Sequence, residues 1–498
     1  MSRGASLTRT IRPSTRGQTE GRLPFQPAAP SVTVVGIDDT DSTAGMCTTF
    51  AAHRIAERLR QRPSEGDERS SAVRRLLLVR LNPAVEFKTR GNAALAVHTD
   101  ADPETALRVA VDAVGDGARH EDRNTNPGVV VAPGDPLDVP ATVGRFARRV
   151  VRDLVPPEAA RERVADAGYA HETWGSGRGL VGALAAVGAW RGRGPAADWT
   201  YERIAYREAA RRGTPREVDR DAVFAAADRG YPTVWDTVDR ETGETVCVPH
   251  TPGPVLFGIR GDDPEAVREV AAAVDSEPVA AAETFVTNQG TDDHLRSGAV
   301  AAVEAGRSYR LDGVVVDAPE TREGGHVFLT VAGPDRAPAA SGVDADEAGE
   351  SETSPAVARW ALAVTADDLP ADARLPCVAF EPTGRFRSRV RDLREGDRVT
   401  VCGEVSDGTL KLEKFALRSR RTVEPVVPTC PACGRSMESA GADQGYRCRD
   451  CDTSASGRTT RRVERPAPGW YEVPPTARRH VAKPLVRGGF DAPTRPER

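Results

Sequence analysis

The sequence has few lysines, few cysteines and no long apolar run. The absence of a long apolar run and the small number of cysteines each exclude a class of protein. Lysine occurs only at positions 88, 411, 414 and 483, so arginine carries nearly all the positive charge. No run of about 18 apolar residues exists, which excludes a membrane-spanning helix. Eight cysteines in 498 residues do not make a disulfide framework. We therefore expect a cytoplasmic protein in a reducing compartment, without a membrane partner.

What remains is a long chain of balanced composition. With 498 residues, 39% hydrophobic and 28% charged, it predicts a globular protein of about three or four domains. The net charge of -5 does not exclude nucleic acid, because a basic face can occur within a balanced total. Residues 1–30 lack the apolar core of a secretory signal. We interpret them as a disordered extension, with a transit peptide or a misplaced start codon as alternatives.

A short apolar strand that runs into three aspartates is the first candidate site. Residues 34–37 precede Asp38, Asp39 and Asp41, as in a buried strand whose end lies at a site. Carboxylates this close repel one another unless a cation lies between them, and crowded hard oxygen ligands suit Mg²⁺ and phosphate chemistry. An Asx-rich turn that caps the next helix explains the same residues equally well.

The helix that follows this cluster has an N-terminus suited to phosphate. The helical pattern of residues 51–62 comes directly after Thr48 and Thr49. One of these two residues would lie where free N–H groups and the helix dipole favour an anion.

Two further loops contain candidate phosphate ligands. Lys88 and Arg90 lie between strands expected at 75–81 and 93–98, in either a solvated turn or a phosphate clamp, and the scarcity of lysine favours the clamp. A glycine-rich turn, Gly177-Arg178-Gly179, precedes an apolar helix expected at 180–190. It lacks the complete dinucleotide fingerprint, so close packing and a phosphate cradle both remain open.

The middle of the chain alternates strands with helices. We expect helices within residues 102–116, 136–168, 220–229 and 264–274, and strands at 129–132, 201–206, 233–239, 246–250 and 255–260. This alternation predicts an α+β sandwich, with a ferredoxin-like fold as the first choice. A dense polar loop follows at residues 285–295 and includes Asp292 and Asp293.

From about residue 308 the pattern changes to strands alone. They are expected at 309–316, 327–331, 358–364, 398–405 and 409–417, and Asp407-Gly408 forms the hairpin turn before the last one. Five such strands favour a small barrel of the OB-fold type. An acidic insert rich in Ala, Ser and Pro, residues 333–355, interrupts them and is interpreted as a disordered surface loop.

Two CxxC pairs end the recognisable pattern: Cys430 with Cys433, and Cys448 with Cys451. Four thiolates at this spacing bind Zn²⁺ tetrahedrally, and so small a module needs the metal to fold. The other four cysteines are interpreted as buried thiols. The surrounding arginines either keep the module soluble or bind nucleic acid beside the barrel.

Eight segments, in this order, resemble the archaeal isoleucine-tRNA 2-agmatinylcytidine synthetases, the TiaS family. They are residues 36–42, 45–50, 87–94, 177–188, 201–207, 255–261, 287–295 and the zinc ribbon. The resemblance implies a multidomain α+β protein. Its expected parts are a disordered extension (1–30), an ATP-dependent kinase-like catalytic domain (31–160), a ferredoxin-like domain (161–300), an OB-fold (305–420), a zinc ribbon (428–455) and a tail (456–498).

The resemblance also implies an ATP-dependent carbon–nitrogen ligase. Family members attach agmatine to carbon 2 of the first anticodon cytidine of the minor isoleucine tRNA with a CAU anticodon, through a phosphorylated cytidine. The expected ligands and partners are therefore ATP, Mg²⁺, Zn²⁺, agmatine and this tRNA. A kinase and a non-catalytic nucleic-acid-binding protein are the alternatives.

Residue roles follow from the same resemblance. Asp38 and Asp39 are expected to hold Mg²⁺–ATP, and Thr48 to become phosphorylated. Asp41, Lys88, Arg90, Gly177, Arg178 and Gly179 are the other candidates for ATP and metal binding. Because agmatine is cationic at both ends, carboxylates should meet it, and either Asp292 or Asp293 is the candidate.

Overall fold

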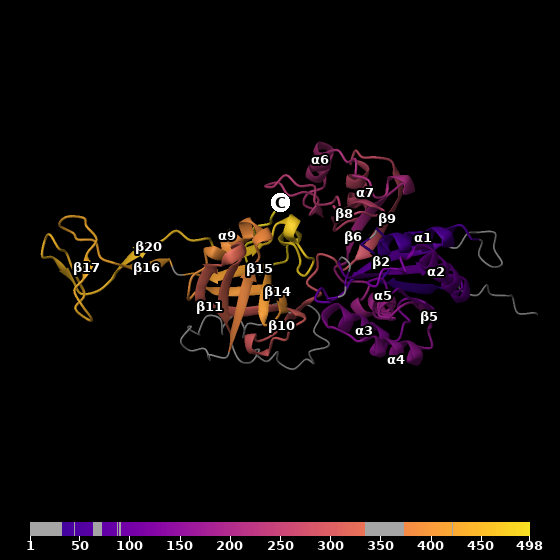
Figure 1. The fold of residues 1–498 in the computed structure, drawn as a ribbon, viewed down its shortest axis with the longest axis horizontal. Helices are drawn as coiled ribbons and strands as arrows, with labels where there is room; N and C mark the ends of the chain where they lie inside the picture. The colour runs from indigo at the N-terminus through magenta and orange to yellow at the C-terminus, as the bar shows by residue number, and fades with distance from the viewer. Residues whose placement is uncertain are drawn as a thin grey trace, which may run out of the picture.

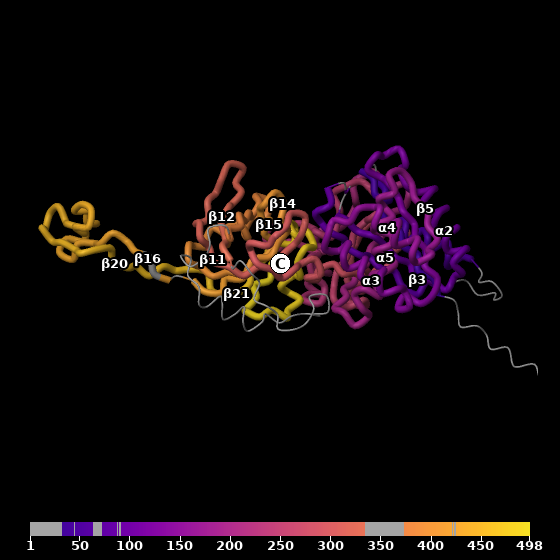
Figure 2. The backbone as a smooth tube through the Cα atoms, turned by 90° about the horizontal axis from the view of Figure 1, so that it is seen from below, coloured from indigo at the N-terminus to yellow at the C-terminus, as the bar shows by residue number. Residues whose placement is uncertain are grey.

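The computed structural model describes residues 32–43, 45–62, 72–86, 88, 91–333, 373–420 and 422–498. The expected extension at residues 1–30, Arg90, most of the acidic insert and the strand expected at 358–364 lie outside these residues. A nine-stranded sheet with its helices lies at one end of an elongated molecule, a barrel lies in the middle and a small ribbon lies at the other end (Figures 1 and 2). No helix among the described residues is long and apolar enough to cross a membrane.

The first five strands form an antiparallel half-sheet in the order β5-β4-β1-β3-β2. They are β1 (Thr33–Asp38), β2 (Val73–Arg80), β3 (Ala93–Thr99), β4 (Gly128–Pro133) and β5 (Ala170–Thr173). Successive side chains of a strand point to opposite faces. Val34 therefore belongs to one hydrophobic core, and Val35 and Ile37 belong to another. β1 is central and buried on both faces, as its apolar run predicts.

Helices cover both faces of this half-sheet. Two of them contribute to the core on one face: α1 (Thr48–Arg60) and α2 (Pro103–Gly117). Three contribute to the core on the other: α3 (Ala141–Arg152), α4 (Pro157–Ala167) and α5 (Gly179–Arg193). α5 lies directly on β1, so that a Cβ added at Gly36 would be 2.0 Å from the carbonyl oxygen of Ala183. The expected boundary at residue 160 lies within α4, before β5, which pairs with β4, and before α5, which packs on β1.

The second half of the sheet has the order β9-β6-β8-β7. Its strands are β6 (Thr200–Arg207), β7 (Val234–Trp235), β8 (Val255–Gly261) and β9 (Val279–Thr287), with helices α6 (Arg220–Gly230) and α7 (Pro264–Ala272). β9 runs parallel to β2 and joins the halves through Leu77 and Val286. The strand expected at 246–250 is wrong, since these residues form turns and a bend. β9, which begins in an alanine run, was not expected.

Five strands close a barrel. They are β11 (Arg307–Thr321), β12 (Val327–Ala332), β13 (Arg374–Ala379), β14 (Arg398–Ser406) and β15 (Thr409–Ser419), and the short helix α9 (Arg385–Arg391) lies between β13 and β14. β11 pairs with both β12 and β14, which closes the ring. A short strand, β10 (Leu295–Ser297), adds to β11. The strands expected at 309–316, 327–331, 398–405 and 409–417 are confirmed.

The ribbon is an insertion in the barrel part of the chain. A two-stranded stem, β16 (Val423–Val426) with β20 (Thr459–Arg462), carries a small sheet of β17 (Glu438–Ser439), β18 (Tyr446–Arg447) and β19 (Ser454–Ala455). Beyond the stem, β21 (Gly469–Glu472) returns to pair with β15. The segment expected as a tail, 456–498, therefore supplies the second strand of the stem and an added strand of the barrel sheet.

Candidate active site at the end of β1

The three aspartates lie where β1 ends. Asp38 is the last residue of the strand, and its carboxylate faces α5, where a Cβ added at Gly182 would be 1.9 Å from Oδ2. Asp39 has a left-handed backbone with φ of 56°, a conformation that is uncommon outside glycine and turns the chain out of the strand. The glycine in α5 and the turn at Asp39 together place two carboxylates side by side.

Arg178 connects Asp39 to the N-terminus of α5. Its Nε donates to Oδ2 of Asp39 at 2.7 Å, and a second guanidinium nitrogen donates to the carbonyl of Asn124. Asp39 Oδ2 also accepts from the backbone N–H of Asn126 at 3.2 Å. The structure thus brings Arg178 from the glycine-rich turn to the aspartates, as predicted for one site.

Asp41 has a different task from its two neighbours. Its Oδ1 accepts from the backbone N–H of Thr48 at 2.7 Å, which caps the first turn of α1. Its backbone carbonyl accepts from Thr125 Oγ1 at 2.7 Å. The capping interpretation therefore holds for Asp41, whereas Asp39 directs its carboxylate to Arg178 and away from that helix.

Thr48 is the first residue of α1 and is buried, with 2% of its surface exposed. Its Oγ1 has no hydrogen-bond partner among the described residues. The next hydroxyl, Oγ1 of Thr49, lies 3.1 Å from the sulfur of Cys47. A buried hydroxyl without a partner is energetically unfavourable, and such groups call for an explanation. Thr48 thus has a buried hydroxyl, a potential nucleophile, and its backbone is bound to Asp41 of the acidic cluster.

The pKa values of the carboxylates show how unfavourable this crowding is. Burial and, to a smaller degree, the charge of Asp39 raise the pKa of Asp38 well above its usual range. Burial raises the pKa of Asp39 to about 6, although Arg178 opposes the shift. Raised carboxylate pKa values mean that ionisation disfavours the folded state, so this contribution to stability falls as the pH rises through 6. A bound cation would offset that loss.

The glycine-rich turn packs closely against β4. Gly177 has a φ of 73°, and a Cβ at Gly179 would lie 2.5 Å from the carbonyl oxygen of Asn126. The close-packing interpretation therefore holds for Gly179, while its use as a phosphate cradle remains a prediction. Asn126 was not predicted as a site residue. It links the turn to the cluster, because its Oδ1 accepts from Ser176 N–H at 2.8 Å.

Lys88 lies away from this arrangement and beside the barrel. Its Nζ donates to the carbonyl of Pro83. Burial lowers its pKa, and the nearby charges that act on it are Glu404, Arg479 and Lys411. The structure does not bring Lys88 to Asp38 and Asp39.

Both agmatine candidates are already paired within the protein. Oδ1 of Asp292 accepts from Nζ of Lys414 at 2.9 Å and from the backbone of Lys483 at 2.7 Å. The carboxylate of Asp293 binds Arg193, with Nε to Oδ2 at 2.6 Å. Burial opposes ionisation of Asp292, but the charge and hydrogen bond of Lys414 outweigh it and lower the pKa of that carboxyl.

A second charged cluster, missed in the sequence, lies between the two halves of the sheet. Glu202 on β6 is 4% exposed, and its Oε1 accepts from Nε of Arg260 at 3.2 Å. Arg80 lies 3.8 Å from its other oxygen, and Asp41 is among the charges that act on Arg80. The only sequence signal for it was the charged residue at the second position of the segment 201–207.

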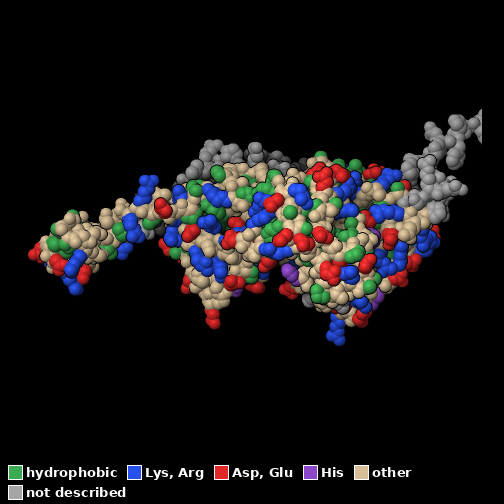
Figure 3. Space-filling view, turned by 90° about the horizontal axis from the view of Figure 1, so that it is seen from above, with side chains coloured by type: hydrophobic (Ala, Val, Ile, Leu, Met, Phe, Trp, Pro, Cys, Tyr) green, Lys and Arg blue, Asp and Glu red, His purple; other side chains and the backbone are tan. Residues whose placement is uncertain are grey.

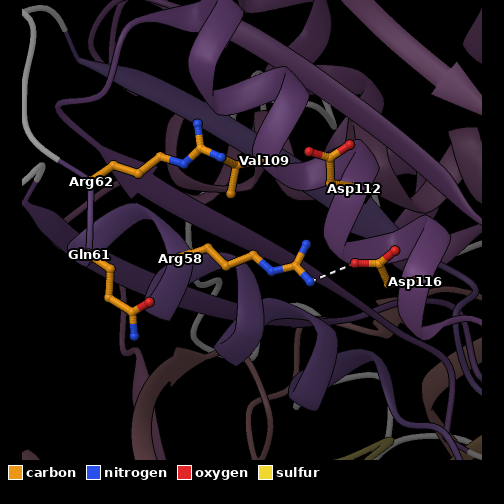
Figure 4. A pocket seen from close by; sticks show the side chains of 6 residues that line it. All are labelled: Arg58, Gln61, Arg62, Val109, Asp112 and Asp116. Carbon is orange, nitrogen blue, oxygen red and sulfur yellow. Dashed lines mark hydrogen bonds and ion pairs between the residues drawn. The ribbon is translucent and has the colours of Figure 1, made fainter.

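One hollow among the described residues lies elsewhere. It is lined by Arg58, Gln61, Arg62, Val109, Asp112 and Asp116, and an ion pair of 2.7 Å joins Arg58 to Asp116 (Figure 4). These residues belong to the C-terminal end of α1 and to α2, whereas Thr48 begins α1. The aspartate cluster is therefore not part of that hollow.

The four ribbon cysteines form a metal site geometry. Their sulfur atoms all lie within 4.8 Å of one another, and the sulfurs of Cys433 and Cys448 are 3.6 Å apart. Tetrahedral Zn²⁺ with bonds of about 2.3 Å holds its sulfurs roughly 3.8 Å apart. The residues therefore fit the predicted zinc.

Comparison with known proteins gives matches along the chain. Sequence models of three domains match: the TiaS TCKD domain at residues 34–175, the TiaS FLD domain at 177–294 and the TiaS C-terminal zinc ribbon domain at 427–466. The isoleucine-tRNA 2-agmatinylcytidine synthetase TiaS of Haloquadratum walsbyi is 49% identical over 94% of this chain and 100% of its own.

Solved structures agree with the sequence matches. The structure of a complex of TiaS with its isoleucine tRNA and ATP has a TM-score of 0.77 and 36% identity, and covers 94% of this chain and 100% of that chain. The structure of TiaS with the same kind of tRNA, AMPCPP and agmatine has a TM-score of 0.75 and 34% identity with the same coverage.

The contact between Gly182 and Asp38 gives the first prediction. In Gly182→Ala the new methyl group must push the Asp38 carboxylate aside, because the space is occupied. For the catalytic role expected of Asp38, a displacement of about 1 Å lowers turnover by about a hundredfold, whereas the helix itself gains from alanine. Gly115→Ala in α2 is the matched control, since nothing lies within 4 Å of its Cβ. Equal ATP turnover in both variants would contradict the assigned position of Asp38.

The ribbon gives the second prediction. Cys448→Ser should lower the bound zinc from about one ion per chain to almost none and unfold the ribbon, because the module depends on four thiolates. Zinc analysis of the purified variants measures this. Cys402→Ala removes a buried barrel thiol outside the cluster and should keep the metal. Full zinc content in Cys448→Ser would refute the site.

Proposed function

This chain belongs to the TiaS family, and we propose that it attaches agmatine to carbon 2 of the first anticodon cytidine of the minor isoleucine tRNA with a CAU anticodon, using ATP. The observation that carries the proposal is the pairing of chain-long similarity to a synthetase with the geometry at Thr48. That threonine begins α1 and donates its backbone N–H to Asp41, whose charge acts on Asp38 and Asp39. Similarity and site chemistry thus point to the same activity.

The reaction needs activation because a cytosine carbonyl oxygen is a poor leaving group. Transfer of the γ-phosphoryl group of ATP to that oxygen converts it into a phosphate ester. The primary amine of agmatine then attacks carbon 2, the carbon–oxygen bond breaks, phosphate leaves and the nitrogen loses a proton. The target base must leave its stack to reach such a site.

In this proposal Asp38 and Asp39 hold Mg²⁺ with the phosphates of ATP. The ion would neutralise charge that develops on the transferred phosphoryl group. Arg178 orients Asp39 and adds positive charge at the N-terminus of α5, where Gly177 and Gly179 allow the phosphates to approach the backbone. Asp41 holds the first turn of α1, which positions Thr48 for phosphorylation.

The other candidate binding residues could contact agmatine or ATP only if their present partners in the protein were replaced. Asp292 and Asp293 are each bound to an internal cation, so agmatine would have to replace Lys414 or Arg193. Lys88 would have to leave its place beside Glu404 to reach ATP. Arg90 lies outside the described residues.

The domain types are part of the proposal. The half-sheet with α1 to α5 is the kinase-like catalytic domain. The strand order β9-β6-β8-β7, with α6 and α7, matches a ferredoxin-like βαββαβ unit. The closed five-stranded barrel, with α9 between its third and fourth strands, matches an OB-fold. We place the enzyme in the cytoplasm with its tRNA.

The ribbon and its stem supply a surface for RNA. Exposed arginines lie along them, and Figure 3 shows basic side chains on the arm between ribbon and barrel. The exposed arginines of the ribbon and its stem are Arg435, Arg447, Arg449, Arg458, Arg461 and Arg462. Arginine neutralises phosphates, and a small barrel beside a basic module is suited to single-stranded or looped RNA.

Incubation with labelled agmatine, ATP, Mg²⁺ and the CAU-anticodon isoleucine tRNA transcript tests the function. Label should enter the tRNA only when ATP is present. Consumption of ATP without label in RNA would favour a kinase. RNA binding without any ATP use would favour a non-catalytic nucleic-acid-binding protein.

Thr48→Val tests the role of the threonine. The substitution keeps the shape and removes a hydroxyl without a described partner, so the fold should be retained. Agmatine incorporation should fall by about a hundredfold or more, as when a group that acts on the reacting atoms is lost. Thr49→Val is the matched control, because its hydroxyl contacts Cys47. Unchanged incorporation in Thr48→Val would remove Thr48 from the mechanism.

A further inference from the structure

The last 32 residues, 467–498, form a segment that we name the C-terminal strap. It leaves the ribbon stem, adds β21 to the barrel sheet and continues to the second half of the nine-stranded sheet. The chain ends between the barrel and that half (Figure 1), and the carbonyl oxygen of Arg498 accepts from Arg240 N–H at 3.0 Å. The strap therefore joins two parts of the molecule.

One end of the strap is fixed to the barrel. Phe415 of β15 pairs in register with Tyr471 of β21. Trp470 is fully buried, and its indole N–H donates to Asp491 at 2.9 Å. This end is therefore part of the barrel sheet, and the ribbon stem directly precedes it in the chain.

The other end is held by aspartates of the ferredoxin-like unit. Nε of Arg478 lies 2.9 Å from Oδ2 of Asp236, and both side chains are almost fully buried, at 4% and 3% exposure. Arg478 also binds Glu472 of β21 at 2.5 Å. Asp236 has a left-handed backbone with φ of 55°, and such strain persists where the surroundings enforce it. One arginine thus links β21 to the residue after β7.

Further contacts extend this link. Nε of Arg487 lies 2.6 Å from Oδ1 of Asp262, directly after β8, and its Nη1 donates to the carbonyl of Gly290 at 2.5 Å. Thr476 Oγ1 donates to Asp239 at 3.1 Å, and Asp239 also binds Arg385 of α9. Basic and hydroxyl side chains of the strap thus meet aspartates that follow β7 and β8.

The barrel meets the other half of the sheet as well. Arg296 and Arg307 both bind Asp153 at the end of α3, at 2.7 Å each. That contact involves α3, which covers the first half of the sheet, whereas the strap contacts residues that follow β7 and β8 of the second half. The barrel is thus attached to the nine-stranded sheet and its helices at two separated places.

We propose that Arg478 and Arg487 are positioning residues for tRNA: through the strap they fix the barrel and the inserted zinc ribbon relative to the Asp38–Asp39 site. This inference rests on the proposed function. An RNA that contacts both the active site and the ribbon is bound at two places, and the second contact adds affinity only when the geometry is set in advance. If the strap no longer fixes the barrel, the second site has a lower effective concentration for an RNA bound at the first, although neither RNA contact itself is altered.

The test uses the full-length enzyme and two RNAs, the complete isoleucine tRNA and its anticodon stem–loop alone. In Arg487→Gln the Kd and KM for the complete tRNA should rise by roughly tenfold, a usual size for coupling between sites. The Kd for the stem–loop, the Kd for Mg²⁺–ATP and kcat at saturating tRNA should stay unchanged. Arg163→Gln, which removes an ion pair within α4, is the matched control.

Two further variants keep the inference falsifiable. Arg478→Met removes the buried pair and should act in the same direction, provided that circular dichroism shows a folded chain. Arg487→Asp combined with Asp262→Arg restores an ion pair with reversed polarity and should recover the affinity for complete tRNA. Equal effects of Arg487→Gln on both RNAs, or no effect on either, would overturn the inference. A wild-type enzyme that binds tRNA but incorporates no agmatine would instead refute the proposed function.

Discussion

The crowding of carboxylates at the end of β1 is the constraint on which the site depends. Asp38 and Asp39 are held together by a left-handed turn and by the close approach of Gly182, and Arg178 donates a hydrogen bond to Asp39. Their raised pKa values show that the ligand-free arrangement is unfavourable when both are ionised. Proteins retain such strain where a ligand relieves it, and a divalent cation with ATP would do so. The site thus has a geometry suited to a positive charge from a bound cation.

The surrounding fold keeps this arrangement rigid. α5 is built from small residues, so it lies on β1 and places Arg178 and Gly179 beside the aspartates. β2 and β9 join the two halves into one sheet, and Arg80 on β2 meets Glu202 on β6 at this junction. Asn288 continues the junction, since its side-chain amide exchanges two hydrogen bonds with the backbone of Arg80. The polar segment at 285–295 therefore helps to connect the two halves of the sheet.

Local patterns were sufficient to predict the elements that carry their own periodicity. β1, α1, the barrel strands β11, β12, β14 and β15 and the cysteine cluster follow from alternation, helical spacing and ligand spacing, whereas β13 was not expected. Long-range partners were not predictable in this way. Asp292 and Asp293 were expected to face a diamine, yet their cations, Lys414 and Arg193, are 122 and 100 residues away in the chain. Asn126 links the glycine-rich turn to the aspartates only because α5 packs against β4 in the folded chain.

The errors have the same origin. The segment 246–250 has the composition of a strand but forms turns and a bend, because a strand also needs a partner with a free edge. β21 is only four residues long, and its partner, β15, lies about 50 residues earlier, so nothing local marked it as a strand. The rarity of lysine drew attention to Lys88 but gave no information on the charges near it, which are Glu404 and Lys411 of the barrel and Arg479 of the strap.

The most direct test of the central claim is to locate the cation. Mn²⁺ replaces Mg²⁺ at oxygen sites, and its anomalous scattering identifies it in crystals grown with a non-hydrolysable ATP analogue. The account predicts a Mn²⁺ peak about 2.0–2.3 Å from carboxylate oxygens of Asp38 and Asp39, in contact with the phosphates. Binding of Mn²⁺ and nucleotide at another place, without contact to Asp38 and Asp39, would contradict this account.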